Sequence, residues 1–272
     1  MIERVGPRTL ETLDAGAGAF RTAQPYPHVV LEDFLRPEAA DTLLAEFEAT
    51  RDGWTFLHHV NEKKRQFTKL ERLGPTTRAI VAELQSPEFI AHIETLTGIS
   101  GLVADPDLDG SGLHEIKRGG HLNMHVDFLS HVVKRHWSRR LNLLIYLNKG
   151  WREEYNGHLE MWSRDMQRCE KKVLPVFNRC LIFQTSDISW HGHPTPLACP
   201  PETSRKSLAL YYYRDEGHTV SLASTDYRAV PTDSLKKRAL IALDRWALRV
   251  YSLLKRYVGL RDRVVSAILK RF

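Results

Sequence analysis

Two metal-binding side chains lie two residues apart in the segment His125-Val126-Asp127. Successive side chains of an extended strand point to opposite faces, so His125 and Asp127 would share one face. A neutral imidazole and a carboxylate side by side can fill two adjacent positions of an octahedral metal. The chain contains thirteen histidines, so the pair indicates a metal site only if a third ligand is available.

A third ligand is available at His191, in ISWHGHPTPL, directly after the apolar run CLIFQTSDISW. Two histidines and one carboxylate form a facial triad, which leaves three metal positions open and suits non-haem iron(II). His193 remains an alternative third ligand, because it lies two residues further on and would face the same way. His121 and His131 are interpreted as solvated or loop histidines.

An arginine and a hydroxyl begin a later strand, RKSLALYYYR, where Arg205 and Ser207 share a face. A guanidinium can give a carboxylate two parallel hydrogen bonds. Arg205 with Ser207 therefore predicts an anchor for a dicarboxylic acid whose other end binds the metal. The alternative is an ordinary arginine at a strand end.

These side chains need a scaffold, and residues 113–214 supply about eight short β-rich runs separated by Gly, Asn, Asp and Pro. Such a series is typical of a sandwich or jelly roll. In HEIKRGGHLNMHVDF, Gly119-Gly120 indicates a hairpin turn between two strands. GHLEMW, VLPVF, CLIFQ, ISW and KSLALYYYR are further candidate strands.

The run RRLNLLIYLN (139–148) alternates most clearly. Its leucines and Ile145 would face the core, while Arg140, Asn142 and Tyr146 would face a side polar enough to line a cavity. The preceding basic segment, LSHVVKRHWSRR, is interpreted as a solvated loop, with a lid or a clamp on an anionic substrate as the alternative.

Helices flank this β region. A proline after Arg36 starts an amphipathic run to about Ala49, and a second run begins near Ser86 and ends by Gly98. Both would cover one face of the sheet. Near the C-terminus, Thr232 or Asp233 would cap a helix to about residue 257, with a shorter run from 261.

Five elements follow one another in the order of a known family: HxD at 125–127, YLN within LLIYLNKGW, Gly-x-Leu at 157–159, HGHPTPL and RKSLALYYY. The chain thereby resembles the prolyl-4-hydroxylase-like branch of the 2-oxoglutarate/iron(II) oxygenases, over residues 25–215. The lead-in PYPHVVLEDFLRPEAADTLL is also similar. The resemblance implies a mainly β fold with helices (α+β), whose core is a double-stranded β-helix (jelly-roll, cupin-like) with N-terminal covering helices and a C-terminal helical appendage.

The resemblance also implies a complete site. Iron(II) would be held by His125, Asp127 and His191, and 2-oxoglutarate by Arg205, Tyr146 and, assisting, Ser207. Family members use O2 to convert 2-oxoglutarate to succinate and CO2 while an unactivated C–H bond is oxidised. Related halogenases have a small residue in place of the carboxylate ligand, so the aspartate favours hydroxylation. Where the family often has a tyrosine before the HxD strand, this chain has HEIKRGG, so His114 and Ile116 receive no cosubstrate role.

Amino-acid composition indicates the cellular compartment and the distribution of charge along the chain. With 42% of its 272 residues hydrophobic, the chain can bury a sizeable core. Its three cysteines are an odd number without paired spacing, which argues against a disulfide scaffold and for a reducing compartment. They form no CxxC, so a thiolate zinc site is not expected. No run approaches the ~20 apolar residues of a transmembrane helix, and a cytoplasmic protein is expected. Eleven Lys/Arg and two acidic residues follow position 235, so residues 1–235 carry −3 although the chain carries +6.

We therefore expect an N-terminal segment (1–24), an oxygenase domain (25–228) and a basic amphipathic helical tail (229–272). The tail would pack on the domain or form a homodimer, lie on an anionic membrane surface, or contact phosphates. No motif predicts specific nucleic-acid binding. The expected reaction is hydroxylation of an amino-acid-like, peptidyl or small-molecule substrate. The alternatives are a cupin-like binding protein without turnover, and an oxygenase whose macromolecular substrate docks on the tail.

Overall fold

The computed structural model describes residues 2–131, 133–220 and 225–258, of which 247–258 are described as helix backbone only. Its helices are α1 (Pro7–Ala15), α2 (Ala17–Thr22), α3 (Pro37–Ala49), α4 (Pro75–Leu84), α5 (Pro87–Thr97) and α6 (Leu235–Val258), with 3-10 turns at Leu70–Arg72 and Glu153–Tyr155. Its strands are β1 (His28–Leu31), β2 (Thr55–His59), β3 (Glu62–Phe67), β4 (Leu102–Ala104), β5 (Gly112–Lys117), β6 (Leu122–Val126), β7 (Trp137–Tyr146), β8 (Leu159–Trp162), β9 (Cys169–Val173), β10 (Cys180–Gln184), β11 (His191–His193), β12 (Ser204–Asp215) and β13 (Asp226–Tyr227).

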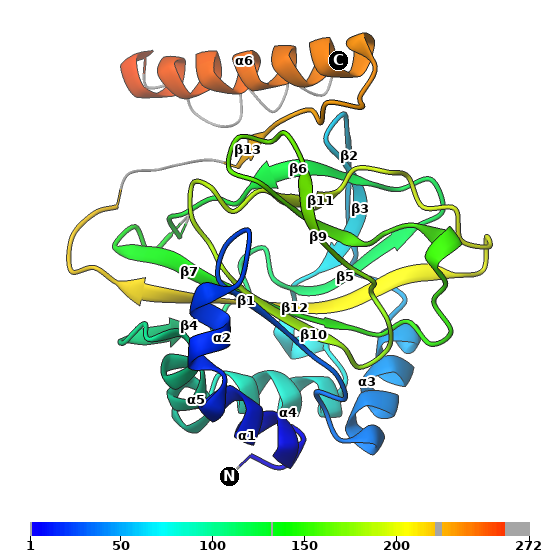
Figure 1. The fold of residues 1–272 in the computed structure, drawn as a ribbon, viewed down its shortest axis with the longest axis vertical. Coiled ribbons are helices and arrows are strands. Elements are labelled where there is room, and N and C mark those ends of the chain that lie inside the picture. The colour runs from blue at the N-terminus through cyan, green and yellow to red at the C-terminus, as the bar shows by residue number, and fades with distance from the viewer. Residues whose placement is uncertain (1, 132, 221–224, 259–272) are drawn as a thin grey trace.

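The strands follow one hydrogen-bonded path, β1-β10-β7-β12-β5-β3-β6-β11-β8-β9. The path folds back on itself, so that β1-β10-β7-β12-β5 and β6-β11-β8-β9 form two facing layers with β3 between them (Figure 1). This arrangement is a double-stranded β-helix, which confirms the predicted fold. The eight strands β5 to β12 occupy Gly112 to Asp215, where about eight were predicted.

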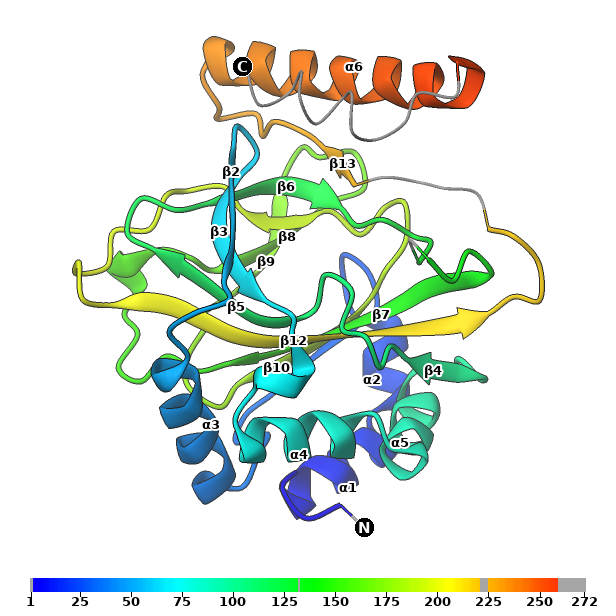
Figure 2. The same ribbon diagram turned by 180° about the vertical axis from the view of Figure 1, so that it is seen from behind.

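Helices α1 to α5 lie on the outer side of the β7-β12 layer, and α6 lies at the opposite end of the molecule (Figures 1 and 2). The large core between sheet and helices includes Leu141, Leu143 and Ile145 of β7, as the alternation predicted. The predicted helices α3 and α5 are confirmed. Ser86 caps α5 by accepting a hydrogen bond from the Phe89 amide (3.2 Å). The structure adds α1, α2, α4 and the β2–β3 hairpin, which were not predicted.

The hairpin predicted at Gly119-Gly120 is wrong, because β5 and β6 do not pair with each other. Strand β3 lies between them: Arg65 pairs with Glu115 of β5, while Glu62 pairs with Leu122 of β6. The glycine turn therefore carries the chain from one layer to the other (Figure 2). The local sequence predicts the turn. It cannot predict that β3, which lies 50 residues upstream, pairs between β5 and β6.

Two strand boundaries also differ from the prediction. The run CLIFQTSDISW is not one strand, because β10 ends at Gln184 and a turn at Ser186–Ser189 separates it from β11. His191 is thus the first residue of β11. In VLPVF only Val173 belongs to a strand, the last residue of β9.

The C-terminal part of the chain packs against β6, the strand that carries His125. Strand β13 pairs with β6 opposite Val126 and His125. Helix α6 begins after Ser234, whose hydroxyl accepts from the Lys237 amide (3.2 Å), rather than after Thr232 or Asp233 as predicted. The predicted run from 261 lies outside the described residues. Within the part of the chain that the structure describes, no helix has the length and hydrophobicity needed to cross a membrane.

Candidate active site

The three predicted ligands meet on the inner face between the two layers. His125 lies on β6 with Asp127 just beyond its end, and His191 pairs with His125 from β11. One ligand atom from each residue lies within 4.8 Å of the others, and all three residues are buried. The imidazole Nε2 atoms of His125 and His191 lie 3.6 and 3.4 Å from the Asp127 carboxylate oxygens. Such a cluster can bind one divalent metal on one side and leave its other positions open.

Backbone carbonyls fix both imidazoles. His125 Nδ1 lies 2.9 Å from the Asn123 carbonyl oxygen, and His191 Nδ1 lies 2.8 Å from that of Ser189. A carbonyl can only accept, so each Nδ1 carries the proton and each Nε2 keeps its lone pair for a metal. Burial, and next the neighbouring His125, lowers the pKa of His191 to about 4. The ring is therefore neutral, as a ligand must be.

Two polar groups hold the carboxylate. Asn142 Nδ2 donates to Asp127 Oδ2 (2.7 Å), and the Arg139 guanidinium lies 3.3 Å from the same oxygen. Burial alone would raise the pKa of Asp127, but the charge of Arg139 holds this pKa well below its ordinary value. Arg139 also donates to Asn142 Oδ1 (2.6 and 2.8 Å). We call the triad with Arg139 and Asn142 the metal end.

Arg139 stood both in the predicted strand 139–148 and in the predicted basic loop. The structure places it in β7, where it is 3% exposed, so the loop interpretation is wrong for this residue. Its guanidinium lies 3.3 Å from the Tyr211 ring centroid and 4.7 Å from that of Phe128. These cation–π contacts and the aspartate replace the water that a buried cation loses. Strict alternation would place Arg139 on the face of Leu141, but a register shift between β7 and β12 at Tyr212/Tyr213 interrupts the alternation, and Arg139 contacts Asn142 instead. His131 lies between β6 and β7 outside any strand, as predicted for a loop histidine, but it is buried (1% exposed) rather than solvated.

The predicted anchor residues lie together further along the same face. Ser207 pairs with Tyr146 across β12 and β7, and Arg205, two residues before Ser207, faces the same side. The Arg205 guanidinium lies 5.0 Å from the Tyr146 ring centroid, and its Nε donates to the Gly157 carbonyl (2.8 Å). A side chain at position 157 would collide with Leu197 at 2.6 Å, and φ there is +76°. The glycine thus allows the close approach to Arg205.

Polar atoms without partners gather at this second end. The Tyr146 hydroxyl and both ring nitrogens of His193 are buried and have no hydrogen-bond partner. His193 lies outside the group of residues that could share a metal ion, so the structure offers His191 rather than His193 as third ligand. We call Arg205, Tyr146, Ser207 and His193 the anchor end. Its free donors beside a guanidinium fit a carboxylate, as the metal end fits a divalent iron.

Aromatic rings that the sequence did not indicate surround the triad. Tyr227 of β13 packs on the His125 ring, with centroids 5.5 Å apart, and Phe183 packs on His191 at 4.7 Å. Tyr26 donates to the Trp190 carbonyl (3.1 Å) beside β11. No motif could identify Tyr227, because only tertiary pairing of β13 with β6 brings it to the site.

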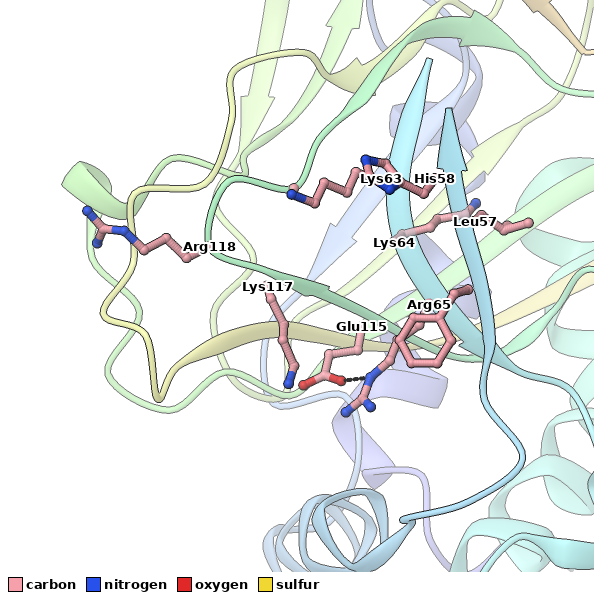
Figure 3. A pocket seen from close by; sticks show the side chains of 10 residues that line it. Leu57, His58, Lys63, Lys64, Arg65, Glu115, Lys117 and Arg118 are labelled. Carbon is pink, nitrogen blue, oxygen red and sulfur yellow. Dashed lines mark hydrogen bonds and ion pairs between the residues drawn. The ribbon is translucent and has the colours of Figure 1, made fainter. Parts of the chain in front are cut away.

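A hollow lies on the face of β5 that points away from the candidate active site. Side chains of β2, β3 and β5 line about 310 Å³ of space, and Lys63, Lys117 and Arg118 make it basic (Figure 3). Glu115 and Lys117 alternate with His114 and Ile116, so this hollow faces away from the anchor end. Arg65 is already paired with Glu115 there. The hollow is therefore separate from the candidate active site.

Comparisons with known proteins agree with this geometry. The sequence profile of the 2OG-Fe(II) oxygenase superfamily matches residues 111–213. The chain is 25% identical over 201 residues to prolyl 3-hydroxylase OGFOD1 of Mus musculus, an alignment that takes 70% of this chain and 33% of the relative. This chain therefore spans about a third of that relative's length.

Two solved structures are similar in fold. A Pseudomonas putida prolyl-4-hydroxylase has a TM-score of 0.55 and 19% identity, covering 75% of this chain and 99% of the other. A Trichoplax adhaerens prolyl hydroxylase in complex with a hypoxia inducible factor oxygen degradation domain peptide fragment has a TM-score of 0.55 and 16% identity, covering 77% and 92%.

A double-stranded β-helix with two histidines and one carboxylate on its inner face has the ligand set typical of mononuclear non-haem iron sites. The Arg205 guanidinium on the same face is a group that can bind a carboxylate. Residues 111–213 match the 2-oxoglutarate/iron(II) oxygenase superfamily, and the fold of the chain is similar to that of a prolyl-4-hydroxylase.

Proposed function

We propose that this chain hydroxylates an unactivated C–H bond of a peptidyl substrate, with release of succinate and CO2. The observation that carries the proposal is the joint geometry of the inner face. A buried triad keeps three ligand atoms free at one end, and Arg205 with Tyr146 keeps an anion anchor free at the other. Iron(II), 2-oxoglutarate and O2 together would supply the oxidising chemistry when bound.

The residues of this chain would have distinct tasks in that reaction. His125, Asp127 and His191 would hold the iron, and Arg205 with Tyr146 and Ser207 would hold the far carboxylate of 2-oxoglutarate. Because a protein carboxylate already fills one metal position, hydroxylation is favoured over halide transfer. Arg139 and Asn142 would keep that carboxylate oriented, as groups behind metal ligands do.

A peptidyl substrate is supported by the relatives, which are named as prolyl hydroxylases, one of them bound to a peptide fragment. Half-buried rings of Tyr227, Tyr211 and Phe128 lie beside the triad. Such rings offer apolar, rigid surface to a compact ring such as that of proline. Prolyl peptides are therefore the first substrates to test.

The test is turnover with defined products. Purified protein with iron(II) and 2-oxoglutarate would be incubated with a prolyl-rich peptide library under isotopically labelled dioxygen. We expect succinate and a peptide that has gained one labelled oxygen atom, both dependent on Asp127. Metal-loaded, folded protein that consumes no 2-oxoglutarate with any peptide would instead support a cupin-like binding protein without turnover.

A second candidate is an oxygenase whose macromolecular substrate docks on α6. The helix buries Ile241 (2% exposed) against the body. It leaves large apolar side chains on its surface: Leu235 82%, Leu240 43%, Leu243 60% and Trp246 63% exposed. The double variant Leu243→Ser/Trp246→Ser would lose turnover on a large substrate and keep turnover on a short peptide. If the double variant turns over the large substrate and the short peptide as fast as the unmodified protein does, this candidate is excluded.

A further inference from the structure

Among the described residues, His193 is the histidine whose two ring nitrogens are both buried without a hydrogen-bond partner. The residue is only 2% exposed. An imidazole in its neutral form offers one donor and one acceptor, and leaving such groups unpaired inside a protein is costly. Buried polar atoms of this kind indicate a missing partner.

The register of β11 places His193 at the anchor end. His191 and Gly192 pair with Met161 and Glu160 of β8, so His193 comes level with the start of β8, close to Gly157. The Gly157 carbonyl is the group that Arg205 Nε binds at 2.8 Å. A register shift lies between His191 and His193 on β11, and His193 lines one small hollow together with Gly157.

Two simpler roles for His193 fit less well. A metal-ligand role fails because His193 is outside the group that could share one ion with His125 and Asp127. A packing role would be served better by an apolar side chain, since burial of two unpaired nitrogens disfavours folding. The Tyr146 hydroxyl is likewise buried and unpaired on this face. Two side chains with free polar atoms beside one guanidinium indicate a common anionic partner.

We propose that the His193 imidazole donates a hydrogen bond to the distal carboxylate of 2-oxoglutarate, next to Arg205 and Tyr146. The inference rests on the proposed function, because it assigns a further contact to the same cosubstrate. His193 would then help to select a dicarboxylic 2-oxo acid over a monocarboxylic one.

The test is direct binding to protein loaded with manganese(II), which allows no turnover. Calorimetry would measure the Kd of 2-oxoglutarate and of 2-oxovalerate, in which a methyl group replaces the distal carboxylate. A hydrogen bond to a charged group predicts that His193→Phe raises the Kd of 2-oxoglutarate roughly ten- to a hundredfold. The Kd of 2-oxovalerate and that of manganese should stay unchanged.

Two further variants make the result interpretable. His193→Gln keeps a donor and should recover part of the 2-oxoglutarate affinity; it also provides the measurement if the phenylalanine variant does not fold. His158→Phe is the matched control, because that imidazole lies next to Gly157 but already pairs with Glu153 (2.6 Å). Its cosubstrate Kd should equal that of the unmodified protein.

Each other result has a definite meaning. An unchanged 2-oxoglutarate Kd in both His193 variants, or an equal loss for both 2-oxo acids, would overturn the assignment of His193. Failure of the unmodified, metal-loaded protein to bind 2-oxoglutarate would instead overturn the proposed function.

Discussion

The metal end and the anchor end share one inner face, yet they differ in how their polar groups are satisfied. At the metal end each imidazole Nδ1 is bonded to a carbonyl, and Asp127 is held by Asn142 and Arg139. At the anchor end the Tyr146 hydroxyl and both His193 nitrogens lack partners. At the metal end the ligand atoms are already oriented for an ion. At the anchor end the unpaired polar atoms would find partners only in a ligand that carries hydrogen-bond acceptors. Substitutions should therefore affect metal affinity at one end and cosubstrate affinity at the other.

The largest effect is expected for Asp127→Ala. The change removes a metal ligand and leaves the buried Arg139 guanidinium without its anionic partner, a loss of about 3–5 kcal/mol in stability. Anaerobic addition of iron(II) and 2-oxoglutarate to the unmodified protein should give a weak visible absorption band, and the variant should show none. Denaturant unfolding measures the stability change. A folded variant that keeps the band would exclude Asp127 as a ligand.

Arg205→Gln should have the next largest effect, confined to the anchor end. Loss of a bidentate, charge-assisted contact predicts a 2-oxoglutarate Kd roughly a hundredfold higher or more. Calorimetry on manganese-loaded protein measures it, and the metal Kd should not change. Lys117→Gln is the control, because Lys117 lines the separate hollow on the opposite face (Figure 3). If the metal and 2-oxoglutarate both bind to Arg205→Gln with the Kd of the unmodified protein, Arg205 is not the carboxylate anchor.

Asn142→Leu tests the supporting groups of the metal end. The variant loses the 2.7 Å hydrogen bond to Asp127 and the acceptor for Arg139. Loss of such a support typically weakens metal binding by roughly 10–100-fold. Competition with a chromophoric chelator measures this, and the 2-oxoglutarate Kd at saturating metal should change little. A metal Kd equal to that of the unmodified protein would show that Arg139 alone suffices.

The two ends also differ in how far sequence could predict them. His125 and Asp127 follow from strand alternation, and Arg205 and Tyr146 from alternation together with ordered motifs, because their strands are long enough to be periodic. The role of Arg139 escaped prediction because a register shift between β7 and β12 at Tyr212/Tyr213 breaks the alternation of the predicted run 139–148. Strand β3 and Tyr227 escaped prediction because they reach the site through pairing between segments far apart in sequence. Local patterns contain no information about which distant strand enters between two neighbours.

The smallest effect is expected for Tyr146→Phe, which removes one free hydroxyl and retains the ring beside Arg205. One neutral donor to a carboxylate predicts a few-fold rise in the 2-oxoglutarate Kd, with no change in metal affinity or fold. Tyr213→Phe is a matched control: its hydroxyl is also buried without a partner, but its ring packs on His131 and Trp137. Equal Kd values in the two variants would mean that an unpaired tyrosine alone does not mark the anchor. A rise in the 2-oxoglutarate Kd that occurs in Tyr146→Phe but not in Tyr213→Phe would show that the unpaired Tyr146 hydroxyl binds the cosubstrate.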